Sequence, residues 1–139
     1  MIVKKCTLED ISELAMLNKQ LIEDEKSDNS MNIKELEERM HGFITGEYDA
    51  YFFVEEESVV GYALVKKDCS PFYLRQFLIE RKYRQKHYGT QAFHDLLQYL
   101  QVDDIDIEVL SWNETGKKFW EKCGFTERSR YMRYHGDKS

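Results

Sequence analysis

The segment from residue 77 to residue 90 constrains the fold most, because it passes from an apolar run through a basic turn into a helix start. Phe77, Leu78 and Ile79 favour a buried strand. Four basic residues follow, at Arg81, Lys82, Arg84 and Lys86. A helix that begins there presents unpaired backbone N–H groups and a partial positive charge. The segment therefore predicts a strand–loop–helix unit that binds a diphosphate.

Sequence patterns predict secondary structure along the whole chain. Apolar residues at helical spacing predict helices over about 8–26, 32–46 and 89–100, with a short fourth helix capped by Asn113 and ended by Gly124. Thr7 with Asp10 forms a capping-box pattern before the first helix. Strand patterns cover 2–6, 50–55, 59–67, 71–79, 105–109 and 125–134. This order of elements predicts an α/β sheet with helices on both faces.

The length and the charge of the chain limit the class of protein to which it can belong. A chain of 139 residues with 42% hydrophobic residues fits a single domain spanning residues 1–139. The net charge of −6 argues against a general nucleic-acid binder. Residues 1–60 hold 6 basic and 15 acidic residues, whereas residues 61–139 hold 14 and 11. This asymmetry is either ordinary solvated surface, or an acidic half that attracts a cationic amine beside a basic loop that holds an anionic cofactor.

The cysteines and the lengths of the apolar runs indicate the cellular compartment of the protein. Cys6, Cys69 and Cys123 are odd in number and lack metal-ligand spacing, so we expect a reducing compartment and no metal. No hydrophobic run approaches the length of a membrane span, and the N-terminus opens no signal-peptide core. We therefore expect a cytoplasmic protein without membrane or nucleic-acid partners.

Two motifs make the chain resemble the GNAT acetyltransferases, which acetylate amines with acetyl-CoA. The pyrophosphate loop of that family reads R/Q-x-x-G-x-G/A, and residues 84–89 read Arg-Gln-Lys-His-Tyr-Gly, with His87 in place of the first glycine. The segment 113–125 resembles the closing segment of the family, with Trp120 in place of its usual tyrosine. The motifs occur in the family's order, and the resemblance covers nearly the whole chain.

The resemblance implies a single mixed, mostly antiparallel central sheet, which is the acyl-CoA N-acyltransferase fold. It also implies that the strand before the loop makes backbone hydrogen bonds to the pantetheine arm of acetyl-CoA, and that the loop amides surround the diphosphate. The cofactor-binding residues implied in this way are Phe77, Leu78, Ile79, Arg84, Gln85, Lys86, His87, Tyr88, Gly89, Thr90, Asn113 and Trp120.

The resemblance assigns the chemistry less completely. Glu108 aligns with an acidic residue that some family members use as general base, and its alternative role is an exposed strand glutamate. Glu80 is a weaker alternative base, since its position favours a role at the start of the loop. An indole does not release its proton at working pH, so Trp120 cannot act as the family's general acid. Tyr73, Tyr88 and Cys123 could replace it. The expected acceptor-binding residues are Glu23, Asp24, Tyr73 and Gln76, with a solvated helix end as the alternative for the two acidic residues.

Two functions remain open at this point. The first is an N-acetyltransferase that moves the acetyl group directly to a primary amine of a small molecule or peptide. The second is a non-catalytic regulatory or sensor module that binds acyl-CoA, which the departures at His87 and Trp120 favour. Family members commonly carry one more C-terminal strand, and its absence would leave a sheet edge that a second chain could cover, so a homodimer is also open.

Overall fold

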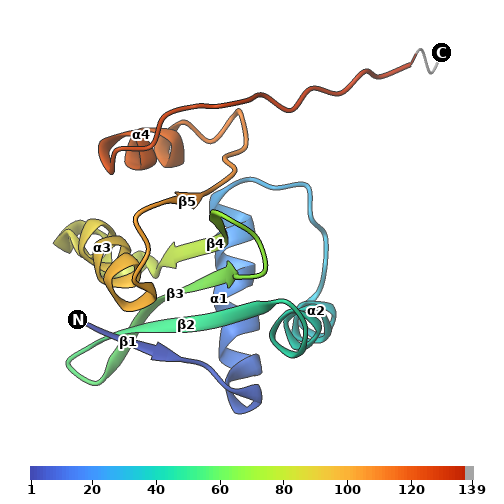
Figure 1. The fold of residues 1–139 in the computed structure, drawn as a ribbon. Coiled ribbons are helices and arrows are strands. Elements are labelled where there is room, and N and C mark those ends of the chain that lie inside the picture. The colour runs from blue at the N-terminus through green and yellow to red at the C-terminus, as the bar shows by residue number, and fades with distance from the viewer. Residues whose placement is uncertain (137–139) are drawn as a thin grey trace.

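The computed structural model describes residues 1–136, apart from the side chain of Gln85, and these residues form one central sheet with helices on both faces (Figure 1). The strands are β1 (Ile2–Lys5), β2 (Tyr48–Glu55), β3 (Ser58–Lys66), β4 (Phe72–Ile79) and β5 (Ile105–Asp106). They lie in the order β1-β2-β3-β4-β5. The first four are antiparallel to their neighbours, and β5 is parallel to β4. The expected mixed, mostly antiparallel sheet is confirmed.

The helices occur along the chain close to where the sequence patterns predict them. They are η1 (Leu8–Asp10), α1 (Ile11–Asp24), α2 (Ile33–Thr45), η2 (Arg81–Lys86), α3 (Tyr88–Leu100) and α4 (Glu114–Lys122). The capping box of Thr7 and Asp10 opens the 3-10 turn η1 rather than α1 itself. Asn32 forms a full capping box with Glu35 at α2. Asn113 caps α4, where its side-chain oxygen accepts a hydrogen bond from the Gly116 N–H at 3.0 Å.

Each face of the sheet carries its own hydrophobic core, because successive strand residues point to opposite faces. Leu14 of α1 and Met40 of α2 pack with Tyr62 and other residues on one face, which lies behind the sheet in Figure 1. On the other face, Phe93 of α3 packs with Tyr51 and other strand residues. No helix within residues 1–136 is long and apolar enough to span a membrane.

Strands β4 and β5 separate almost as soon as they meet. Only Phe72 with Ile105 and Tyr73 with Asp106 are paired, so the strand expected over 105–109 is shorter than its alternating pattern predicts. On its other side β4 pairs with β3 through to Ile79, apart from one extra residue at Arg75. The edge of β4 that faces β5 therefore has no partner strand from residue 74 to residue 79 in the described chain.

The strand expected over 125–134 is wrong. Gly124, with φ of 107°, ends α4 as predicted, and Phe125 packs against the α3 face of the sheet. From residue 126 to residue 136 the chain is exposed and has no regular structure. A strand needs a partner for its backbone groups, and this segment runs out past α4 and β5 rather than alongside the sheet (Figure 1).

Candidate active site

The loop between β4 and α3 forms a cradle of backbone amides. Residues 81–86 make the 3-10 turn η2, and α3 begins directly after His87. No side chain caps the first turn of α3, so the N–H groups of Tyr88, Gly89 and Thr90 are not taken by a cap. Together with the partial positive charge of the helix N-terminus, these groups suit an anionic oxygen.

His87 holds the conformation that turns the loop into the helix. Its φ of 60° and ψ of 18° lie in the left-handed region, where glycine is favoured over every L-residue. This explains why the family pattern has glycine here. Histidine occurs in this region more readily than most residues do, so the loop keeps its turn without glycine.

Gly89 allows α3 to start close against α4. A Cβ atom at this position would lie 3.0 and 3.2 Å from two ring carbons of Phe119. A side chain at this position would push the Phe119 ring aside by a few tenths of an ångström, so the glycine favours close packing of α3 against α4 beside the cradle.

The arginines of the loop bind the end of α1, although both side chains remain exposed. The Arg81 Nε donates to Asp24 at 2.9 Å, and the Arg81 backbone N–H donates to the Gln20 side chain, also at 2.9 Å. The Arg84 guanidinium donates to the same Asp24 carboxylate and, through Nε, to the Ile79 carbonyl at 2.8 Å. These contacts fasten the loop to the last turn of α1. We call this cluster the α1 clamp.

The α1 clamp includes two residues with expected ligand roles. Arg84 and Asp24, expected at the cofactor and at the acceptor, bind each other in this structure, and both ligand roles stay predictions. Glu23 joins the clamp at 3.5 Å from Arg81. Lys86 remains exposed and has no ion pair within the described residues, so it is the loop cation best placed to meet an added anion.

Beside the cradle, the side chain of Phe77 belongs to an aromatic cluster that joins β4, α3 and α4. Its ring lies 5.1 Å from Trp120 and 6.1 Å from Phe119, measured between centroids. Trp120 also contacts Phe93 and Phe125 at 5.4 and 5.3 Å. The indole fills the centre of this cluster, and it supplies no exchangeable hydroxyl proton.

Glu108 lies beside Tyr73, next to the point where β4 and β5 separate. Burial, and then the Glu108 carboxylate, raise the pKa of Tyr73 to about 12. Glu108 itself is exposed, in the segment that follows β5. The fold brings these two residues together, and the pair offers one carboxylate and one neutral hydroxyl at the same place.

The end of α1 also reaches this region, through a contact that the sequence gives no sign of. The indole N–H of Trp112 donates to the carbonyls of Glu25 and Lys26 at 3.2 and 3.3 Å. Burial, and then the neighbouring Asp24, raise the pKa of Glu25. The one available signal in the sequence is a tryptophan in an otherwise polar loop.

Gln76 is buried on the α1 face and takes part in a polar cluster there. Its side-chain oxygen accepts a hydrogen bond from the Tyr62 hydroxyl at 2.8 Å. Nearby, Arg39 donates to buried Asn18 at 3.0 Å, and burial, then Arg75, lower the pKa of Arg39. The cluster places polar groups under α1 and α2, and the expected role of Gln76 at the acceptor stays a prediction.

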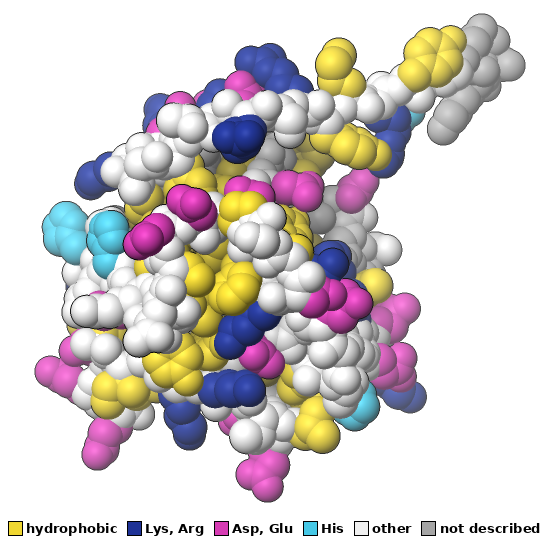
Figure 2. All heavy atoms as spheres, in the orientation of Figure 1, with side chains coloured by type: hydrophobic (Ala, Val, Ile, Leu, Met, Phe, Trp, Pro, Cys, Tyr) yellow, Lys and Arg dark blue, Asp and Glu magenta, His cyan; other side chains and the backbone are white. Residues whose placement is uncertain are grey.

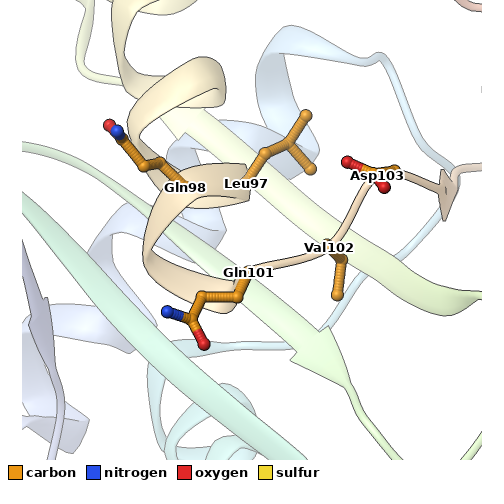
Figure 3. Close-up of a pocket in the computed structure, with 5 residues that line it drawn as sticks. All are labelled: Leu97, Gln98, Gln101, Val102 and Asp103. Carbon is orange, nitrogen blue, oxygen red and sulfur yellow. The ribbon is translucent and has the colours of Figure 1, made fainter.

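A surface hollow of about 460 Å³ lies at the far end of α3. Figure 3 shows its lining residues, Leu97, Gln98, Gln101, Val102 and Asp103, where the chain leaves α3 for β5. The cradle lies at the other end of the same helix, so the hollow is separate from the candidate active site.

Comparison with known proteins identifies the family. The model of the "Acetyltransferase (GNAT) domain" family matches residues 6–136. The chain belongs to the GNAT acetyltransferases. The chain matches no curated protein by sequence.

Several solved structures share the fold of this GNAT chain. A possible acetyltransferase from Clostridium difficile 630 has a TM-score of 0.78 at 14% identity, covering 99% of this chain and 98% of its own. The BH1408 protein of Bacillus halodurans, as a tetramutant, has a TM-score of 0.75 at 21% identity, covering 97% and 99%. The aminoglycoside N-acetyltransferase AAC(6')-Iy, solved in complex with CoA, has a TM-score of 0.75 at 14% identity, covering 97% and 93%. These identities are low, so the likeness concerns the fold.

Proposed function

We propose that this protein is an N-acetyltransferase that moves the acetyl group of acetyl-CoA directly to a primary amine of a small molecule or peptide. One observation carries the proposal. In the described chain the edge of β4 from residue 74 to residue 79 has no partner strand, and the chain then passes through η2 to the uncapped N-terminus of α3. A long ligand that carries amide groups followed by a diphosphate would place its amides along the β4 edge and its diphosphate at the α3 N-terminus.

The residues present fit acetyl-CoA. At Phe77, Leu78 and Ile79, the backbone groups that face away from β3 are on offer to the amides of the pantetheine arm, since no strand in the described chain pairs with this edge. The Ile79 carbonyl already accepts from Arg84. The amides at residues 88–90 suit the diphosphate, and exposed Lys86 adds a formal charge. In the fold family, a predicted acetyltransferase from Clostridium acetobutylicum was solved with acetyl-CoA, which supports this assignment.

Direct transfer needs an amine without its extra proton and a polarised thioester carbonyl. In the proposal, Glu108 accepts the proton as the amine nitrogen bonds to the acetyl carbon, and the C–S bond breaks to release the thiolate of CoA. A backbone N–H near Leu78 or Ile79 holds the carbonyl oxygen. The Tyr73 hydroxyl, which stays protonated at neutral pH beside Glu108, is available to donate a hydrogen bond.

The acceptor site would lie where the end of α1, the start of β4 and the segment after β5 meet. Glu108, Glu25 and Tyr73 come from these three elements, and the Trp112 indole joins two of them. The carboxylates favour a cationic amine. AAC(6')-Iy, which shares the fold, was solved with the bisubstrate analogue CoA-S-monomethyl-acetylneamine, which supports an amine as the class of acceptor.

Release of free thiol from acetyl-CoA, measured across a panel of primary amines, tests the proposal. Replacing Glu108 with Gln should lower kcat by about a hundredfold or more while acetyl-CoA binding is retained, since general-base catalysis contributes factors of this size. Glu114→Gln is a matched control, because Glu114 is also exposed but lies in α4. Equal rates for the wild type and Glu108→Gln would remove Glu108 from the mechanism.

The alternative is a non-catalytic acyl-CoA-binding module on the same fold. Trp120 favours it, because the position of the family's usual acid holds an indole packed among aromatic rings. Tight acetyl-CoA binding with no thiol release for any amine would support this alternative over the enzyme.

A further inference from the structure

Two arginines lie together on the sheet face that α1 and α2 cover, and neither has an acidic partner. Arg39 of α2 and Arg75 of β4 both contact the ring of Phe43, with their guanidinium carbons 5.4 and 4.9 Å from its centroid. Arg39 donates to the side-chain oxygen of Asn18 at 3.0 Å. Arg75 donates to the Tyr48 hydroxyl at 3.3 Å. No ion pair within residues 1–136 includes either arginine, so their two positive charges are not compensated there.

Two lysines close to this pair show the more usual arrangement of surface cations. Lys66 lies 3.5 Å from Glu47, and Lys67 lies 3.1 Å from Asp49. Figure 2 shows basic and acidic side chains mixed in this way over one face of the molecule. By contrast, the Nε of Arg39 is buried and has no acceptor within the described residues. Buried donors are almost always paired in folded proteins, so this guanidinium indicates a partner that the described chain does not supply.

A β-bulge directs Arg75 to this face of the sheet. On β3, Leu64 pairs with Gln76 and Val65 pairs with Leu74, so Arg75 is the extra residue on β4. Leu74 packs in the core that α3 covers, whereas Gln76 and Arg75 both contact residues on the α1 and α2 side. Neighbouring residues of a regular strand point to opposite faces, and a bulge breaks this rule. The bulge therefore keeps an exposed arginine out of the α3 core and places it beside α2.

The proposed general base lies near the same arginine pair. Tyr73 precedes Arg75 by two residues on β4, and charges of both signs act on its hydroxyl. Burial and then Glu108 raise the pKa of Tyr73, whereas Arg75 lowers it. A carboxylate and a guanidinium therefore lie close to one tyrosine, so a small ligand with its amine at Glu108 also comes near Arg75.

We propose, building on the function proposed above, that the acceptor is a small primary amine that also carries a carboxylate, as a free amino acid does. The amine would lie at Glu108, and the carboxylate at Arg75 and Arg39. A guanidinium can bind a carboxylate through two parallel N–H···O bonds, which gives orientation as well as affinity. A polyamine would instead bring further positive charge to two arginines that lack acidic partners, so the same pair selects against it.

Calorimetric titration of the protein, alone and with CoA bound, tests this substrate class. The ligands are the common free amino acids, the carboxamide of each, and spermidine. A carboxamide keeps the amine but replaces the carboxylate with a neutral group, so it is the matched ligand. We expect at least one free amino acid to bind tenfold or more tightly than its own carboxamide and than spermidine, because hydrogen bonds to charged groups are stronger than neutral ones.

Substitutions of the pair test which residues cause this preference. Arg75 is exposed, so Arg75→Gln should leave the fold intact and lower the preference for acid over carboxamide tenfold or more. Arg39→Gln should lower it as well, with a thermal melt to check folding. Lys66→Gln is the matched control, since it removes a nearby cation that already has acidic partners, and it should change the preference by less than about twofold.

Two results would each overturn the inference: no free amino acid that binds better than its carboxamide, or a preference that Arg75→Gln and Arg39→Gln both leave unchanged. Kinetics add a second readout, because Arg75→Gln should raise KM for the amino acid with kcat little changed, as expected for a contact to an unreactive part of the acceptor. Binding is measured without turnover. Amino-acid binding without thiol release would therefore refute only the proposed function, and thiol release with no preference for carboxylates would refute only this inference.

Discussion

Replacing His87 with glycine tests the role of the cradle's turn. His87 has φ of 60°, and an L-residue in the left-handed region costs about 1–2 kcal/mol. Glycine relieves that cost but loses about 0.5–1 kcal/mol through the greater freedom of the unfolded chain. The net gain in the free energy of unfolding is therefore about 0.5–1 kcal/mol. With an unfolding entropy of about 2.1 cal/mol/K per residue, a chain of this length should gain about 2–3 °C in Tm.

Two further variants separate the backbone from the side chain. Gln101, with φ of 57°, has the same conformation at the other end of α3, so Gln101→Gly should give a similar gain in Tm. His87→Ala removes the imidazole but keeps the strain, so it should not gain. Thermal melts of the wild type and the three variants, followed by circular dichroism, measure these differences.

The same variants also decide whether His87 obstructs the cofactor. The loop already has the turn that glycine would give. The dissociation constants of acetyl-CoA for the wild type and for His87→Gly should therefore differ by less than about tenfold, or about 1.4 kcal/mol in binding free energy. Binding by His87→Gly alone would refute the reasoning, since it would mean that the imidazole closes the cradle. A gain in Tm for Gln101→Gly without one for His87→Gly would refute the strain argument.

Two predictions concern the end of α1. Asp24→Asn should weaken acetyl-CoA binding several-fold by loosening the contacts to Arg81 and Arg84, whereas stronger binding in a calorimetric titration would mean that Asp24 only repels the diphosphate. Burial raises the pKa of Glu25 in the folded protein. Keeping Glu25 ionised in the folded state therefore lowers the free energy of unfolding at pH values above its unfolded pKa of about 4.3. Glu25→Gln should for this reason raise Tm at pH 7 and lose that gain at pH 4. A gain of equal size at both pH values, or the same pattern in Glu23→Gln, would contradict the assignment.

Local patterns predicted most of the fold, because its helices and strands rest on local rules. Thr7 and Asn32 have the side chains that cap helices, and both form capping boxes. The apolar stripe of α3 and the apolar run of β4 predicted the elements on either side of the cradle. The tail was predicted wrongly because its composition favours a strand, while a strand also needs a partner that local sequence does not reveal.

The site was predictable where it depends on neighbours in sequence. The strand–loop–helix unit over residues 77–90 follows from local patterns, whereas the contact of Glu108 with Tyr73 joins residues far apart in sequence and was not predicted. The α1 clamp was not predictable, because it joins Asp24 to residues 57 and 60 positions away. No spacing rule relates charges at such separations, so Arg84 and Asp24 were assigned to ligands instead of to each other.

Calorimetric titration of the wild-type protein with acetyl-CoA tests the central claim most directly, since every proposed role depends on the β4 edge and the α3 N-terminus holding that molecule. We predict one binding site per chain with a micromolar dissociation constant, which corresponds to a binding free energy of about −8 kcal/mol. Binding should weaken as the salt concentration is raised. A folded protein that shows no heat of binding up to millimolar acetyl-CoA would contradict the account.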